Sequence, residues 1–226
     1  MSPRLVRIVF ALIACGSLSF AAEATHRLSA AVRSIQEVMN GSDRTIPQEL
    51  MARAQCVVVV PNLKKGAFFL GGKYGRGFVS CRKPDGVGWS APGSVRIEGG
   101  TFGLQVGAAE SDVFLLVMNQ RGMDSLLRSK FTLGGEASIA LGPLGRSTQA
   151  ETDAFISAEI LTWSRSRGLF LGVSLDGATL REDADWNYEL YGKTITNREV
   201  LTSAEIAVPA GADALLTELN RYSSRR

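Results

Sequence analysis

The chain has 226 residues, of which 45% are hydrophobic and 21% are charged, a composition typical of a single globular domain and not of a disordered chain. Its single histidine, His26, excludes a multi-histidine metal site and argues against a Ser-His-Asp or Cys-His catalytic centre. The formal net charge of +3 is too small to indicate a nucleic-acid-binding protein.

Residues 1–22 have the layout of an export signal. Arg4 and Arg7 precede the apolar run 8–14, and small residues that suit a signal peptidase follow. A second interpretation competes, because the tetrapeptide that ends at Cys15 resembles a bacterial lipobox, and Cys15 would then carry a lipid. Both interpretations predict export to the periplasm or cell envelope, with 23 basic residues against 22 acidic ones in the mature chain, a net charge of +1.

The cysteine count fits export. With Cys15 removed or lipidated, Cys56 and Cys81 remain, an even pair in an oxidising compartment. Both lie in strand-like runs, so we expect a disulfide between neighbouring strands. The alternative is two buried free thiols.

The mature chain opens with an amphipathic helix, predicted over residues 24–39 by apolar residues at helical spacing. Such a stripe either lies on a membrane or packs on the core of its own domain. The candidate membrane-contacting residues are Leu28, Val32, Ile35 and Met39.

A short helix is predicted next, at 47–54, and the β-branched run 56–60 predicts a buried strand. From residue 66 to 141, short apolar runs alternate with glycines, a pattern typical of an antiparallel sheet or barrel. The expected strands in this region are 67–70, 78–81, 94–97, 101–106, 113–118 and 136–141, with a helix at 121–129. Two more strands, 158–163 and 169–175, and a C-terminal helix, 213–222, complete the pattern.

The predicted fold class is therefore α+β. We expect a single domain over residues 23–226, in which a glycine-rich antiparallel β-sheet or barrel-like core is flanked by N- and C-terminal helices.

Three sequence patterns that could indicate nucleotide binding, catalysis or calcium binding lack the residue spacing or the setting that these functions require. The glycines of 66–73 lack the register of a phosphate-binding loop, and Ser80 and Lys83 share the Ser-x-x-Lys spacing only in a strand. The acidic stretch from Asp176 to Glu189 lacks a calcium-loop pattern and predicts a solvated turn and a helix start. We therefore expect no catalytic residues, no metal and no cofactor, and we predict that the protein is not an enzyme.

A basic cluster is the more informative feature, because its cations fall within twenty residues that contain no acid. Such a cluster on a hairpin attracts an anionic membrane surface, or it is a solvated sheet edge that blocks aggregation. The candidate lipid-binding residues are Lys64, Lys65, Lys73, Arg76, Arg82 and Lys83.

Six linked motifs, in order along the chain, together resemble the SYLF domain family. They are Gly72-Lys-Tyr-Gly-Arg-Gly77, Trp89-Ser-Ala-Pro92, Gly103-Leu-Gln-Val-Gly107 with Glu110 and Asp112, Gly142-Pro-Leu-Gly-Arg146, Ser164-Arg-Ser-Arg-Gly-Leu-Phe170 and Gly172-Val-Ser-Leu-Asp-Gly177. The match runs from about Ile46 to Gly192. It departs at Trp163, where the family usually has tyrosine.

The resemblance implies non-enzymatic binding of anionic phospholipids, with membrane contact near the N-terminal amphipathic helix. In yeast and animal endocytic adaptors it also implies actin binding. For an exported protein, phosphatidylglycerol or cardiolipin is the expected ligand class. The alternative function is an envelope scaffold whose basic face binds an acidic partner protein; no nucleic acid is expected, and the sequence leaves the oligomeric state open.

Overall fold

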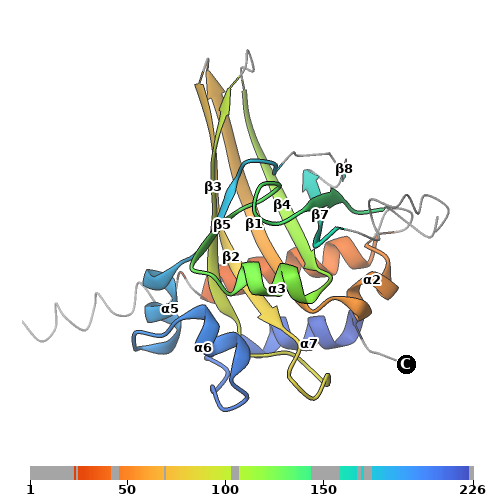
Figure 1. Ribbon diagram of the computed structural model, residues 1–226, viewed down its shortest axis with the longest axis vertical. Helices are drawn as coiled ribbons and strands as arrows, with labels where there is room; N and C mark the ends of the chain where they lie inside the picture. The colour runs from red at the N-terminus through yellow and green to blue at the C-terminus, as the bar shows by residue number, and fades with distance from the viewer. Residues whose placement is uncertain are drawn as a thin grey trace, which may run out of the picture.

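The computed structural model describes residues 23, 25–41, 46–68, 70–102, 107–143, 158–166, 169–170 and 175–223. The export signal predicted for residues 1–22, with Cys15, lies outside these residues. One mixed α/β domain forms around a single curled sheet, which confirms the predicted class (Figure 1).

The sheet has nine strands in the order β5-β9-β3-β2-β1-β4-β7-β6, with β8 paired to β7. Every pairing is antiparallel except that of β6 with β7, which corrects the all-antiparallel expectation. The long connection 142–159 explains the exception, because parallel neighbours need a crossover of a dozen residues or more. The strands are β1 (Cys56–Phe68), β2 (Leu70–Cys81), β3 (Gly93–Phe102), β4 (Gly107–Val117), β5 (Lys130–Thr132), β6 (Ile139–Leu141), β7 (Ile160–Ser166), β8 (Leu169–Phe170) and β9 (Thr179–Glu182).

The helices include all four that the sequence predicts. The N-terminal helix spans 25–39, and α2 (Gln48–Arg53), α3 (Gln120–Leu126) and α7 (Asp213–Tyr222) follow. Two short helices, α5 (Ala184–Tyr191) and α6 (Asn197–Thr202), lie in the stretch between β9 and α7.

Both faces of the sheet are buried, which explains the uninterrupted valine run of β1. Val57 and Val59 point into a core beneath the N-terminal helix, α2 and α7, whereas Val58 and Val60 point into a second core on the other face. We call these the helix-side core and the α3-side core. Successive strand residues alternate between faces, so a strand covered on both sides reads as continuously apolar.

Beyond Val60, β1 changes register with both of its neighbours, and Asn62 adopts a positive φ of 53°. The displaced β1 backbone lies so close to β2 that a Cβ at Gly77 would overlap the Val59 carbonyl. Only glycine fits this position without moving the backbone.

Past this irregularity the four central strands continue beyond the helices as a projecting finger (Figure 1). We call this part the β finger and define it by its described residues, 64–68, 70–74, 98–102 and 107–110. Its strands keep the order β3-β2-β1-β4.

At the other end of the central hairpin, Cys56 and Cys81 are register partners and form a disulfide, as the sequence predicts. The bond closes a chain segment with a sequence separation of 25. Both cysteines are fully buried, so the link fixes β1 to β2 inside the α3-side core.

Removing this link is expected to cost roughly 2–4 kcal/mol of unfolding free energy, the range for disulfides that close loops of this size. The test is urea denaturation of Cys56→Ala/Cys81→Ala beside the oxidised and the reduced wild-type chain. Reduced wild type separates loss of the covalent link from loss of the sulfur atoms. A difference below about 1 kcal/mol between the oxidised and reduced wild-type chains contradicts the prediction.

Candidate functional site

The six cations of the predicted basic cluster occupy three different places. Lys64, Lys65 and Lys73 lie on the β finger, Arg76 lies on the helix-side face of β2, and Arg82 and Lys83 lie at the disulfide end. Since a strand rises about 3.3 Å per residue, Lys73 and Arg82 are about 30 Å apart along β2. The cluster is continuous in sequence but not on the surface.

The finger lysines form the first group. Lys65 and Lys73 are register partners on β1 and β2, and Lys64 is opposite the exposed Tyr74. Lys64 is 3.9 Å from Glu110, an exposed ion pair of little energetic value.

Lys73 is the most buried of the three, with 6% of its surface exposed. Burial lowers the pKa of its ammonium, the neighbouring Lys65 lowers it further, and Asp176 opposes the shift. Like charges opposite one another on adjacent strands are unfavourable, so an anion bound beside this pair would relieve the repulsion.

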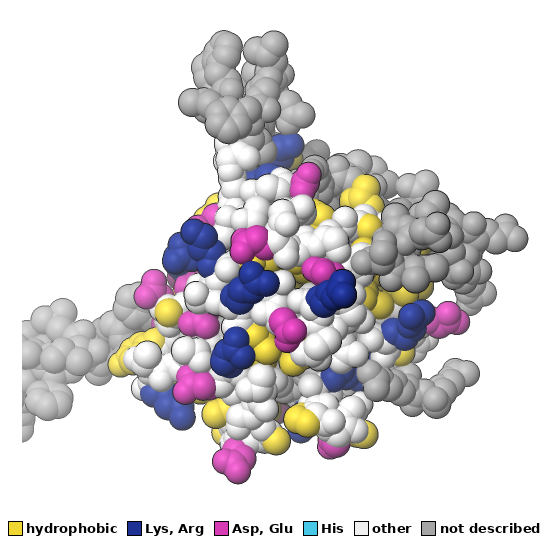
Figure 2. Space-filling model, in the orientation of Figure 1, with side chains coloured by type: hydrophobic (Ala, Val, Ile, Leu, Met, Phe, Trp, Pro, Cys, Tyr) yellow, Lys and Arg dark blue, Asp and Glu magenta, His cyan; other side chains and the backbone are white. Residues whose placement is uncertain are grey.

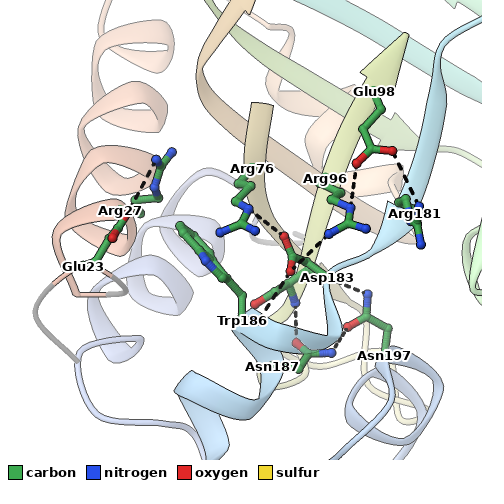
Figure 3. A network of polar contacts seen from close by, with 11 residues as sticks. Glu23, Arg27, Arg76, Arg96, Glu98, Arg181, Asp183, Trp186, Asn187 and Asn197 are labelled. Carbon is green, nitrogen blue, oxygen red and sulfur yellow. Dashed lines mark hydrogen bonds and ion pairs between the residues drawn. The ribbon is translucent and has the colours of Figure 1, made fainter. Parts of the chain in front are cut away.

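Arg76 belongs to a second group, a network centred on Asp183 (Figure 3). Its Nε lies 2.9 Å from Asp183 Oδ2, and its guanidinium lies 4.8 Å from the ring centroid of Trp186. Arg27 of the N-terminal helix contacts the same ring at 4.9 Å. Asp183 is fully buried, which corrects the prediction of a solvated turn, although it does start a helix as the N-cap of α5.

The network extends across the sheet as a row of cations that sequence reasoning missed. Arg76, Arg96, Arg181 and Lys130 are successive register partners on β2, β3, β9 and β5. We call these four residues the basic row. No sequence pattern could find the row, because its members come from four separate segments.

Acidic side chains offset most of this row. Glu98 lies 2.8 Å from Arg96 Nε and 3.6 Å from Arg181, and Asp183 lies 3.9 Å from Arg96 as well as close to Arg76. Charges of both signs are interspersed over the face seen in Figure 2. The basic row therefore stabilises the packing of β9 and α5 on the sheet and does not present a cationic patch.

Arg82 is held in place by backbone carbonyls and by an aromatic ring. Its guanidinium donates hydrogen bonds to the carbonyls of Ala54 in α2's C-cap at 3.4 Å and of Ser223 after α7 at 2.9 Å, and it stacks on Trp89 at 4.1 Å. Further acceptors are the carbonyls of Met51 and Ala52. Arg82 thus ties β2 to α2 and α7, and the exposed Lys83 follows it in a turn remote from the finger.

The four apolar residues predicted to contact a membrane from the N-terminal helix also differ in burial. Leu28 and Ile35 are each 1% exposed and pack in the helix-side core, with Val32 and Met39 partly buried at its margin. The core interpretation of the sequence accounts for this placement. Membrane contact through Leu28 and Ile35 would require the helix to leave the sheet.

Within the described ranges, no cluster of three or more His, Cys, Asp or Glu side chains is placed to hold a metal ion. Among the same residues, no helix is long and apolar enough to cross a membrane. A groove of about 470 Å³ lies beside β6 and β7, lined by residues that include Gly134, Ile139, Leu141 and Leu175.

Comparison with known proteins supplies the family. Residues 98–222 match the Ysc84 family, described as "Las17-binding protein actin regulator". The chain belongs to the Ysc84/SYLF family. The resemblance carried by the six motifs is thereby confirmed.

Individual relatives extend the match over most of the chain. SH3 domain-containing YSC84-like protein 1 of Rattus norvegicus is 34% identical over 187 residues, 82% of this chain and 54% of the relative. SH3 domain-containing protein PJ696.02 of Schizosaccharomyces pombe is 37% identical over 183 residues, 80% of this chain and 42% of the relative. Protein YSC84 of Saccharomyces cerevisiae is 34% identical over 179 residues, 78% and 38% respectively. The chain thus spans about half the length, or less, of these relatives.

Asp183→Asn is expected to lower the free energy of unfolding by roughly 2–3 kcal/mol, because it removes the buried charge that balances Arg76 and Arg96 but keeps the helix cap. This is less than for a fully buried pair, since these arginine side chains are 24% and 20% exposed. The matched control is Glu98→Gln in the same network, expected to cost under about 1 kcal/mol. Equal losses in urea denaturation contradict a special role for Asp183.

Proposed function

We propose that this chain binds anionic phospholipid membranes through the β finger, without catalysis. The observation that carries the proposal is the position of Lys65 and Lys73. They are register partners, and the segments beyond them, 66–72 and 99–109, contain no charged residue of either sign. The outermost charges on the projecting finger are therefore both positive.

The expected attraction is modest and sensitive to salt. Each lysine near an anionic surface contributes about 1 kcal/mol, so the two more accessible lysines, Lys64 and Lys65, together raise affinity roughly thirtyfold. Exposed charges are screened over about 8 Å at physiological ionic strength. Binding through these lysines alone is thus weak and reversible.

Neutralising the two more accessible finger lysines, the exposed Lys64 and the half-buried Lys65, tests the proposal. Lys64→Gln/Lys65→Gln is expected to lower affinity for vesicles of phosphatidylcholine mixed with phosphatidylglycerol roughly tenfold to thirtyfold in flotation assays, and to reduce the salt dependence. The control, Lys83→Gln/Lys193→Gln, removes two exposed lysines off the finger. Equal binding of the wild-type chain to pure phosphatidylcholine vesicles, or equal loss in the control, contradicts the proposal.

A second candidate is binding of an acidic protein, favoured by the family description as a Las17-binding protein and actin regulator. The same finger lysines would then face acidic side chains. Because the chain covers about half or less of its relatives, partners of the whole relatives need not bind the shared part. A partner that binds stoichiometrically in a pull-down, without lipid, supports this candidate over the first.

We further propose that the chain is exported to the cell envelope. The supports are the leader pattern of residues 1–22 and the buried disulfide, which suits an oxidising compartment. In that location the ligand would be phosphatidylglycerol, cardiolipin or a similar envelope anion.

Intact mass spectrometry of the natively produced chain tests export. We expect loss of the leader and a mass that includes one disulfide, and the presence or absence of a lipid on Cys15 distinguishes the two processing routes. An unprocessed chain that begins at Met1 and has free thiols contradicts export.

A further inference from the structure

The end of the β finger is apolar as well as uncharged. Strand register places Phe68 of β1 opposite Leu70 of β2, and Leu70 opposite Phe102 of β3. Large apolar residues thus occupy neighbouring positions on three adjacent strands at the far end of the finger.

Between this apolar end and the lysines lies a belt of small residues. Gly100, Gly72, Gly66 and Ala108 are successive register partners across the four strands. A Cβ at Gly66 or Gly100 would meet no atom within 4 Å. The rest of the described molecule does not cover the finger here, as Figure 1 also shows, so packing against other elements does not explain the glycines.

The spacing along the strands matches the layers of a membrane surface. Lys65 precedes Phe68 by three residues and Lys73 follows Leu70 by three, which is about 10 Å in each strand at 3.3–3.4 Å per residue. Apolar groups of peripheral proteins enter the boundary between head groups and acyl chains to a depth of about 5–10 Å. Lysines about 10 Å behind the apolar end would then lie at the level of the phosphates.

The outer edges of the finger limit how deep it can go. β9 pairs with β3 only at Val95–Glu98, and β7 pairs with β4 only at Asp112–Val117. Past these rows the two outer strands have no further ladder partner among the described residues. Unpaired backbone groups are not tolerated against hydrocarbon, so this geometry suits shallow insertion and not a span.

We propose that the end of the β finger inserts into the membrane interface, with strand positions 68, 70 and 102 at the acyl boundary and Lys65 at the head groups. The inference rests on the proposed lipid binding and adds the inserting element and its depth. It lets the N-terminal helix keep Leu28 and Ile35 in the core while the protein is bound.

A tryptophan reporter tests the insertion. In the full chain carrying Phe68→Trp, fluorescence is expected to be quenched by phosphatidylglycerol-containing vesicles whose phosphatidylcholine is brominated near the head group. The wild-type chain provides the background, because Trp89, Trp163 and Trp186 are only 2–3% exposed. If the chain binds these vesicles and the reporter is not quenched beyond that background, the insertion is wrong and the lipid-binding proposal stands.

A pair of variants gives an independent measure. Leu70→Ser/Phe102→Ser is expected to lower vesicle affinity at least tenfold at physiological salt while keeping binding at low salt, where the lysines suffice. The control Val87→Ser/Val208→Ser changes two exposed apolar residues outside the finger. Thermal unfolding checks that both variants fold. Unchanged affinity in the finger variant overturns the insertion, whereas failure of the wild-type chain to bind any anionic vesicle overturns lipid binding and the insertion together.

Discussion

Burial of the central strands on both faces is the constraint on which the rest of the structure depends. Because β1 and β2 lie between two cores, a charged side chain along their middle must find a partner or a backbone acceptor. Arg76 is paired with the buried Asp183, and Arg82 is held by backbone carbonyls. Among the described residues of β1 and β2, the one exposed cation, Lys64, lies where the strands leave the cores, on the β finger and next to the half-buried Lys65.

Much of the fold could be predicted because its signals are local. The apolar period of the N-terminal helix and the valine run of β1 each arise within a few residues, and both elements form as expected. The length of β2 could not be predicted, since its glycines interrupt the apolar pattern although the strand continues through them. The capping box of Thr196 and Glu199 is a local signal for α6, a helix of six residues that is too short for an apolar period to indicate.

The site was harder to predict than the fold, because charge proximity in the sequence is not proximity in a long strand. The cluster contains the finger lysines, but it also contains Arg82, whose role depends on α2 and on the end of α7. The burial of Asp183 depends in the same way on Arg76 and Arg96, which approach it from two other strands. These roles become visible only when the register of the sheet is known.

The most direct test of the account is hydrogen–deuterium exchange of the full chain with and without anionic vesicles. Binding through the β finger predicts slower exchange in peptides that cover the finger and unchanged exchange in residues 25–39, because the N-terminal helix stays in its core. Slower or faster exchange confined to the helix, with no change in the finger, would contradict the account.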